Sequence, residues 1–477
     1  MGQATQLETD YLVVGAGAMG MAFVDTVIDD PKADVIMVDR RPGPGGHWLD
    51  SYPFVQVHQP SRVYGVNSTP LGRDRIESDG RDAGFYERAS GPEICGYYDD
   101  VMRYRLLASG RVRFFPMSEY VGDRRFRSLV TDHLSEVTVR RALVDATYVA
   151  SRVPATDPPP FEVADGARCV PVGELVGITE PPAGYVVIGG GKTAMDACVW
   201  LLDRGVRPDD ITWIRPRDSW LLNRAYFQPG GSAVSTFEAV VLQIEAMAAS
   251  ASIEEAFERA EAQDVVFRID RDVRPAITRG ATVSAGELEQ LRRIGNVVRM
   301  GHVQRVEAGR IVLDEGEIST SPRHVHVHCA SPGLGVRPAR PIFTDDTITP
   351  QCISRISVTM SSALAGYVES TGRTTEEKNR LCPANPLPDT PFDWMRGLLG
   401  GVRAEMGWQD AGDVQAWLEA SRLNLLQGML SRTDDEVRDL QTRFLSAAFA
   451  AVDKLDEFAA GATPAERERM VDPLAER

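Results

Sequence analysis

The chain has 477 residues, and its 43% hydrophobic and 25% charged residues are the composition of an ordinary folded protein with two or three domains. Its formal net charge of −16 argues against a nucleic-acid binder and against a protein that binds anionic membranes, because both need basic surfaces. We therefore expect neither a nucleic-acid partner nor a membrane partner.

The cysteines and the N-terminal segment both favour a cytoplasmic protein. No two cysteines stand at the CxxC spacing of a redox or zinc pair, and Cys198 and Cys329 lie in apolar patterns typical of buried thiols. The apolar run 11–24 follows Glu8 and Asp10, where a secretion signal would carry positive charge, and glycines interrupt it. No other segment approaches the length of about 20 residues that a membrane span needs.

The first predicted unit is a strand, a glycine-rich turn, a helix and a second strand. YLVV (11–14) predicts the first strand, GAGAMG (15–20) the turn, and DVIMVD (34–39) the second strand, with the helix ending near Ile28. Three glycines in the GxGxxG spacing allow a tight turn, let a pyrophosphate approach the backbone, and let the helix pack against the strand. Asp39 ends the second strand, where a carboxylate can accept both hydroxyls of an adenosine ribose.

The same pattern recurs in a second unit. YVVI (185–188) predicts a strand, GGGKTA (189–194) a turn of the variant form GxGxxA, and DITWIR (210–215) the second strand. A phosphate-binding P-loop would need a glycine where this chain has Val186, so we exclude that interpretation. Two such units predict two parallel sheets.

The two second strands superpose, and the acid Asp39 of the first unit corresponds to Arg215 in the second. A carboxylate would repel a ribose 2′-phosphate, whereas a guanidinium can bind it through two hydrogen bonds. Arg217 can add a second donor. The second unit is therefore predicted to bind NADPH and not NADH.

The segment RPGPGGHW (41–48), together with both turns and the basic residues 215 and 217, resembles the flavoproteins with two dinucleotide-binding domains. It is similar above all to the flavin-containing, Baeyer–Villiger and amine N-hydroxylating monooxygenases, in which a GGxW segment lies along FAD. The resemblance implies FAD on the first unit and NADPH on the second, and it brings VHQPS (57–61) near the flavin ring. The predicted cofactor-binding residues are Gly15, Gly17, Gly20, Asp39, Arg40, Gly45, Gly46, Trp48, Gln59, Gly189, Gly191, Lys192, Thr193, Ala194, Arg215 and Arg217.

The resemblance implies a monooxygenase that uses O₂ and transfers one oxygen atom to a small molecule, such as an amine nitrogen, through a peroxyflavin. The fingerprint FxGxxxHxxx(W/Y/F) of these families is absent before the second turn, so we expect an atypical branch. Two alternatives stay open: an NADPH-dependent flavin oxidoreductase without oxygen insertion, and a non-catalytic nucleotide-binding protein. No catalytic side chain is predicted, since the cofactors carry the chemistry.

We predict an α/β fold with two Rossmann-like dinucleotide-binding domains, extra helices and a helical C-terminal region. The expected boundaries are 1–160 for the first part of the FAD domain, 161–330 for the NADPH domain with a helical insertion at about 235–295, 331–385 for a return to the FAD domain, and 386–477 for the helical region.

Several shorter patterns predict the elements outside the two units. Capping boxes at Ser235/Glu238, Ser252/Glu255 and Ser284/Glu287 predict helix starts, and segment 302–318 predicts a β-meander. A helix from about 433 to 458 is predicted to bury Val437, Leu440, Phe444, Ala448, Val452 and Leu455, and it either caps the molecule or pairs with a second subunit in a homodimer.

Three histidines alternate along one predicted strand. His324, His326 and His328 share a face and could in principle bind a metal. No carboxylate or cysteine completes a ligand set, so we expect neutral, hydrogen-bonded histidines and no metal.

Overall fold

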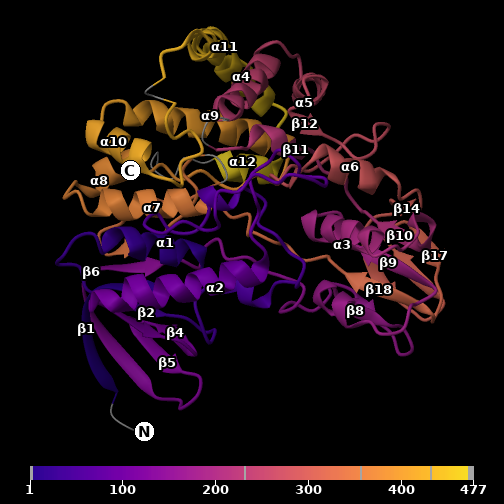
Figure 1. The fold of residues 1–477 in the computed structure, drawn as a ribbon, viewed down its shortest axis with the longest axis horizontal. Helices are drawn as coiled ribbons and strands as arrows, with labels where there is room; N and C mark the ends of the chain where they lie inside the picture. The colour runs from indigo at the N-terminus through magenta and orange to yellow at the C-terminus, as the bar shows by residue number, and fades with distance from the viewer. Residues whose placement is uncertain (1–3, 230–232, 355–356, 430–431, 471–477) are drawn as a thin grey trace.

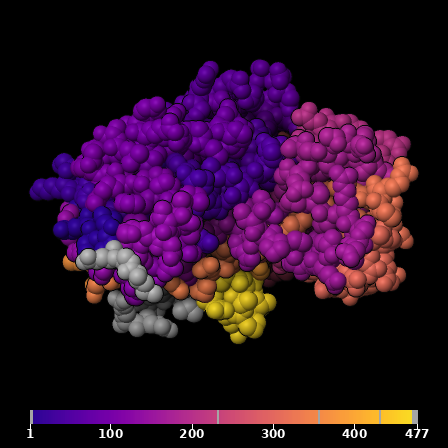
Figure 2. All heavy atoms as spheres, turned by 90° about the horizontal axis from the view of Figure 1, so that it is seen from below, coloured from indigo at the N-terminus to yellow at the C-terminus, as the bar shows by residue number. Residues whose placement is uncertain are grey.

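The computed structural model describes residues 4–229, 233–354, 357–429 and 432–470. Two sheets built around parallel strands, one for each glycine-rich turn, form the two halves of the molecule (Figure 1). Viewed from below, the indigo and purple first half lies beside the magenta and orange second half (Figure 2). The predicted α/β class with two Rossmann-like units is confirmed.

The first sheet has seven strands, and its central strand β1 carries the first turn. β1 pairs in parallel with β2 and β6, and Tyr11, Leu12 and Val13 are fully buried because both faces of the sheet are covered. The order is β3-β2-β1-β6-β5-β4, with β19 added beside β6. The strands are β1 (Thr5–Val14), β2 (Val35–Val38), β3 (Val112–Phe115), β4 (Ser118–Gly122), β5 (Arg125–Ser128), β6 (Leu134–Asp145) and β19 (Thr347–Ile348).

Helix α1 (Ala18–Val27) follows the first turn, and all of its residues are buried. α7 (Val358–Glu369) packs against α1, so this helix is covered on a second side in addition to the side that faces the sheet. A Cβ added to Gly366 of α7 would lie 2.8 Å from the carbonyl oxygen of Phe23, so the two helices cross in close contact. Helix α2 (Gly91–Val101) begins at a capping box formed by Ser90 and Glu93.

The second sheet has five parallel strands in the order β14-β10-β9-β18-β8, and α3 (Lys192–Asp203) follows its turn. These strands are β8 (Cys169–Pro171), β9 (Gly184–Ile188), β10 (Ile211–Ile214), β14 (Val297–Val298) and β18 (His324–His328). The predicted meander is confirmed as β15 (Val303–Val306), β16 (Arg310–Leu313) and β17 (Gly316–Ser319), which form a sheet with β7 (Glu162–Val163).

Helices and a small sheet lie between the second half and the C-terminal region. The small sheet joins β11 (Leu221–Asn223), β12 (Val266–Phe267) and β13 (Thr282–Val283), and the helices are α4 (Ala233–Ala248), α5 (Ile253–Ala262) and α6 (Ala285–Arg292). Ser252 and Ser284 are N-caps as predicted. The prediction for Ser235 is wrong, because α4 already includes Ala233 and Ser235 lies within its first turn.

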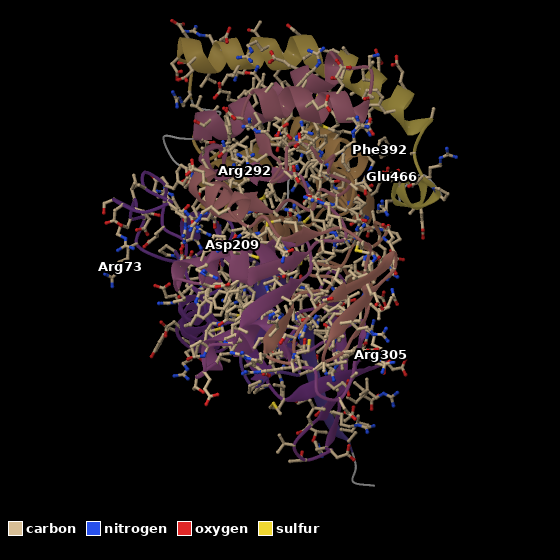
Figure 3. The ribbon with its side chains drawn as sticks, turned by 90° about the vertical axis from the view of Figure 1, so that its right-hand side faces the viewer. Arg73, Asp209, Arg292, Arg305, Phe392 and Glu466 are labelled. Carbon is tan, nitrogen blue, oxygen red and sulfur yellow. The ribbon has the colours of Figure 1, made fainter. Side chains whose placement is uncertain are left out.

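The C-terminal region is helical, as predicted for 386–477. Its helices are α9 (Pro391–Trp408), α10 (Gly412–Ala420), α11 (Asp435–Ala459) and α12 (Pro464–Met470), and α8 (Thr375–Leu381) precedes them. Figure 3 shows α11 and α4 across one end of the molecule, with Glu466 of α12 beside Phe392 of α9. Thr390, the N-cap of α9, donates a hydrogen bond to Glu466 at 2.5 Å, and this bond holds α12 against the start of α9.

Helix α11 buries a narrower face than predicted. Val437 and Leu440 are buried, Phe444, Ala448 and Leu455 are half-buried, and Val452 is exposed. α4 and α9 cover part of α11, and the residues outside these contacts face outward. In the described part of the chain, no helix has both the length and the apolar character needed to cross a membrane.

Candidate functional site

The first glycine turn has the geometry that the spacing predicts. Gly15 has φ +102°, a conformation that other residues rarely adopt, and a Cβ on Gly20 would lie 1.9 Å from the carbonyl oxygen of Gly15. Gly17 is the N-cap of α1 and supplies no side-chain cap. The N–H groups of the first helical turn therefore remain available to an anion.

Three segments predicted to hold FAD converge at this turn. The Asp39 carboxylate accepts hydrogen bonds from the backbone N–H of Ala16 at 2.6 Å and of Arg41 at 2.8 Å. The N–H of Gly45 donates to the carbonyl oxygen of Ala16 at 2.9 Å. Gly46 has φ +61°, and a Cβ there would lie 2.9 Å from the Cα of Gly17, so the two backbones meet where only glycine fits. Asp39, the first turn and the GGHW segment (45–48) therefore form one continuous surface that could bind FAD.

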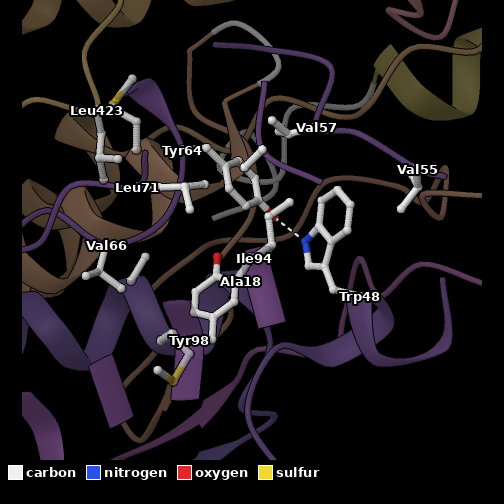
Figure 4. Packing of buried hydrophobic residues seen from close by; sticks show 14 of the residues in the cluster. Ala18, Trp48, Val55, Val57, Tyr64, Val66, Leu71, Ile94, Tyr98 and Leu423 are labelled. Carbon is white, nitrogen blue, oxygen red and sulfur yellow. Dashed lines mark hydrogen bonds between the residues drawn. The ribbon is translucent and has the colours of Figure 1, made fainter. Parts of the chain in front are cut away.

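The other predicted FAD residues differ in their surroundings. Trp48 is buried, and its indole N–H donates to the hydroxyl of Tyr64 at 2.7 Å, as the dashed line in Figure 4 shows. Gln59 is half-buried in the loop before a short 3-10 helix that begins at Ser61. Arg40 is exposed and lies 3.6 Å from Glu119, so its charge is screened by solvent.

The second turn matches the first in conformation. Gly189 has φ +137°, and its carbonyl oxygen accepts a hydrogen bond from the indole of Trp213 at 2.8 Å, which anchors the turn to β10. Gly191 is the N-cap of α3, again without a side-chain cap, and a Cβ there would meet no atom within 4 Å. Ala194 is buried at the helix–strand contact. The open space at Gly191 leaves room for a phosphate at the helix N-terminus.

The two arginines after β10 lie in different surroundings. The guanidinium of Arg215 is buried, lies 4.6 Å from the ring centre of Trp213, and is 3.1 Å from the carboxylate of Asp218. Its Nε and Nη1 atoms are buried without a hydrogen-bond partner, and burial lowers the pKa of Arg215. Arg217 is exposed and lies 4.0 Å from Asp389. Of the two predicted donors, Arg217 therefore lies at the surface, and Arg215 is packed beneath the second turn.

Lys192 follows the second turn directly and is almost fully buried. Its ammonium group donates to the carboxylate of Asp196 one helical turn later, and it lies 3.7 Å from Glu287. Thr193 beside it is half-buried. Lys192 therefore has two carboxylate partners within the protein.

These contacts belong to a larger set of charges between the two halves, which we call the junction cluster. Glu287 accepts a hydrogen bond from Arg224 at 2.6 Å and lies 3.7 Å from Arg88. Arg88 donates to Asp82 at 2.6 Å. On the other side, the hydroxyl of Tyr52 donates to Asp196 at 2.6 Å. The junction cluster is composed of Tyr52, Asp82, Arg88, Lys192, Asp196, Arg224 and Glu287.

The electrostatics of the cluster show how tightly it is coupled. Burial alone raises the pKa of Glu287, but Lys192, Arg224 and Arg88 together lower the pKa to about 2. Burial, with a smaller contribution from the charge of Lys192, lowers the pKa of the nearby His58 to about 4, so its imidazole is neutral at pH 7. The cluster thus pairs buried charges of both signs next to a neutral histidine.

Replacing Glu287 by glutamine is expected to remove a pH-dependent part of the stability. A carboxylate whose pKa is depressed stabilises the fold above its unfolded pKa, and this contribution is lost as the pH falls through the folded pKa. For Glu287 the window runs from pH 4.5 down to about 2. The linked contribution at neutral pH is about 3 kcal/mol. Urea unfolding of the wild type and of Glu287→Gln should therefore differ most near pH 7, and the difference should shrink towards pH 2.

The exposed Glu289 on the same helix supplies the control. Glu289→Gln removes the same charge from the surface and should leave the unfolding free energy unchanged within about 0.5 kcal/mol. A difference between Glu287→Gln and wild type that does not depend on pH would contradict the depressed pKa.

The three histidines of β18 are packed strand residues. The ring of His326 lies between the hydroxyl of Thr320 at 2.9 Å and the carbonyl oxygen of Arg168 at 3.0 Å. Burial lowers the pKa of both His326 and His328. Within residues 4–470, apart from the gaps noted above, no three His, Cys, Asp or Glu side chains are grouped as a metal site would require.

Comparison with known proteins places the chain among mycobacterial relatives. The uncharacterized protein Rv2000 of Mycobacterium tuberculosis (strain ATCC 25618 / H37Rv) is 47% identical over 435 residues, which are 90% of this chain and 80% of that protein. The uncharacterized protein Mb2023 of Mycobacterium bovis gives the same values. The chain belongs to the Rv2000 family. No protein-family model matches this member of the family.

Solved structures give a more distant comparison for this Rv2000-family chain. Cyclohexanone monooxygenase from Rhodococcus sp. Phi1 bound to NADP+ is 14% identical, with 94% of this chain and 98% of that chain covered and a TM-score of 0.49. Oxidized steroid monooxygenase bound to NADP is 15% identical, with 92% and 98% covered and the same TM-score of 0.49.

The junction cluster of this Rv2000-family chain was missed by the sequence interpretation. Glu287 was noted only as a capping-box acid, although its carboxylate accepts from both Ser284 and Arg224. The sequence does indicate one contact of the cluster: Asp196 stands four residues after Lys192, so the two side chains share a helix face. Apart from the bond between Arg88 and Asp82, six positions apart in one loop, the cluster's other contacts join residues far apart in the chain, which no spacing rule connects.

Proposed function

We propose that the chain is an FAD- and NADPH-dependent flavoprotein monooxygenase, with FAD at the first turn and NADPH at the second. The proposal depends on one observation. Each glycine turn lies at the N-terminus of a helix, and the strand beside it ends in a charged residue: Asp39 follows β2 at the first turn, and Arg215 and Arg217 follow β10 at the second. An acid at this position suits a free ribose, and guanidinium groups suit a ribose 2′-phosphate.

The residues of the first turn fit FAD. The uncapped N-terminus of α1 offers N–H groups to a pyrophosphate, and the contact between Gly17 and Gly46 leaves no side chain between the turn and the GGHW segment. Asp39 lies at the end of β2, within reach of a ribose bound along this surface.

The residues of the second turn fit NADPH. The space beside Gly191 admits a phosphate, and Lys192 stands next to it. Arg217 is the exposed donor for the 2′-phosphate, and two guanidinium nitrogens of Arg215, Nε and Nη1, have no protein partner. For Arg215 to bind, its guanidinium would leave Asp218, which keeps Arg299 at 2.8 Å and so stays paired.

Bound together, the cofactors would supply the redox chemistry: NADPH gives a hydride to FAD, and the reduced flavin and O₂ deliver one oxygen atom to the substrate and one to water. The chain's own part is to bind, to orient and to exclude water. A hollow of about 540 Å³ beside Arg88 and Asp82 of the junction cluster has the size of a small-molecule site. Its lining also includes Glu77, Asp79, Asp203 and Arg81, and Arg81 donates to both oxygens of Asp203, so the hollow is lined by charges of both signs. An amine is proposed as the substrate from the family resemblance.

An oxygen electrode tests oxygen insertion against simple electron transfer. Wild-type protein supplied with NADPH should consume O₂ and release hydrogen peroxide, and peroxide release per NADPH should fall when an accepted amine from a panel is added. Peroxide that stays equal to NADPH consumption across the panel, with electrons passing readily to a quinone, would favour the flavin oxidoreductase without oxygen insertion.

A further inference from the structure

One hydrogen bond ties the two halves together beside both glycine turns. Tyr52 follows the GGHW segment of the first half, and its hydroxyl donates to Asp196 at 2.6 Å. Asp196 lies on α3, two residues after Ala194 of the second turn. The bond therefore joins the segment proposed to lie along FAD directly to the helix proposed to receive the phosphates of NADPH.

In this bond the Tyr52 hydroxyl is always the donor and the Asp196 carboxylate is always the acceptor. Burial raises the pKa of Tyr52 well above its usual value, and the Asp196 carboxylate raises it further, so the phenol keeps its proton and donates it to the hydrogen bond. The other oxygen of Asp196 accepts from Lys192. With a donor on each oxygen, the carboxylate cannot rotate without breaking one of the two bonds.

The contacts next to this bond are less directional. Phe54 stacks on Trp200 of α3 with ring centres 4.9 Å apart, and Arg88 faces Glu287 at 3.7 Å. The two hydrogen bonds that Arg81 donates to Asp203 lie at the far end of α3, where both side chains are partly exposed to solvent. Stacked rings and ion pairs at these distances hold two surfaces together but fix their relative position less closely than a hydrogen bond of 2.6 Å does. Loss of the tyrosine hydroxyl should therefore leave the halves docked but less exactly aligned.

We propose that the Tyr52–Asp196 hydrogen bond positions the second nucleotide site against the first, and that it sets the rate of hydride transfer without setting the affinity for either nucleotide. The inference rests on the proposed function, since it needs FAD and NADPH in the two sites. Hydride transfer requires the reacting atoms to approach to about 3–3.5 Å, so a shift of about 1 Å between the two sites slows it by roughly 100-fold. Tyr52 and Asp196 are positioning residues, because they act through the alignment of the two sites.

The test compares Tyr52→Phe with a matched control, Tyr11→Phe. Tyr11 is also buried and also donates to a carboxylate, that of Glu369 at 3.0 Å, but this bond lies within the first half. In anaerobic stopped-flow measurements at saturating NADPH, Tyr52→Phe should reduce FAD about 10- to 100-fold more slowly than wild type. Its NADP+ dissociation constant, measured by calorimetry, should stay within about 2-fold, because no nucleotide contact is removed.

Two further measurements separate positioning from general damage. The double variant Tyr52→Phe/Asp196→Ala should be no slower than the slower of its two single variants, since both changes remove the Tyr52–Asp196 bond and Asp196→Ala additionally removes the bond to Lys192. Hydrogen exchange should rise in segments 46–58 and 190–204 of Tyr52→Phe and stay unchanged there in Tyr11→Phe.

The outcomes distinguish the inference from the proposed function. Wild-type protein that binds FAD and is reduced by NADPH, while Tyr52→Phe behaves like Tyr11→Phe, overturns the positioning role alone. A weaker NADP+ affinity with an unchanged reduction rate also overturns it. Wild-type protein that binds no flavin overturns the proposed function, and the positioning role falls with it.

Discussion

Replacing Gly46 by alanine is expected to empty the first site of FAD. The residue has φ +61°, and its new Cβ would lie 2.9 Å from the Cα of Gly17, which is backbone and cannot turn aside. Either the GGHW segment or the first turn must shift. A shift of this kind costs about 1–3 kcal/mol, which corresponds to roughly a 10- to 100-fold loss of FAD affinity. The flavin-to-protein absorbance ratio after gel filtration measures the effect, together with FAD titration of the apoprotein.

Gly43 supplies the control within the same segment. A Cβ at Gly43 would meet no atom within 4 Å, and its φ is not positive, so Gly43→Ala should bind FAD as wild type does. If Gly46→Ala retains as much flavin as Gly43→Ala, the contact between the turn and the GGHW segment does not form the FAD-binding surface.

Removing the guanidinium of Arg217 is expected to weaken NADPH binding and leave NADH binding unchanged. Arg217 is exposed at the end of β10, and its distance of 4.0 Å from Asp389 leaves it able to donate to a 2′-phosphate. Loss of one hydrogen bond to a charged group costs about 1.5 kcal/mol, or roughly a tenfold higher dissociation constant for NADPH. NADH lacks the phosphate and therefore loses nothing. Fluorescence titrations with both nucleotides check the difference.

Arg207 is the matched control, since it is an exposed arginine at the other end of the same strand, paired with Asp210 at 2.8 Å. Arg207→Ala should change neither affinity. An equal loss for NADPH and NADH in Arg217→Ala would indicate a general charge effect and would remove the basis for NADPH selectivity. Adding Arg215→Ala to Arg217→Ala should lower NADPH affinity further if Arg215 turns outward in the complex.

The sequence predicted the local features of both sites well. The strands before each turn, the positive φ of Gly15 and Gly189, and the requirement for glycine at position 20 follow from spacing and sterics within a few residues. The predicted cap at Ser235 is wrong, because a capping-box pattern of serine and glutamate also fits inside a helix that has already begun.

Features that depend on tertiary packing could not be predicted. The burial of Arg215 follows from Asp218 three residues later and from Trp213 beneath it, and a strand pattern alone does not show which way the side chain turns. The bond between Tyr52 and Asp196 joins residues 144 positions apart. The outward face of α11 is equally a tertiary result, because a helix pattern shows that a face is apolar but not whether another helix covers it.

An absorbance spectrum of the purified wild-type protein, followed by anaerobic titration with NADPH and with NADH, tests whether the two turns bind FAD and NADPH. We expect an FAD spectrum, retained or restored by reconstitution, that NADPH bleaches at least about tenfold faster than NADH at equal subsaturating concentration. Protein that binds no flavin after incubation with FAD, or flavin that NADH reduces as well as NADPH does, would contradict the proposed function.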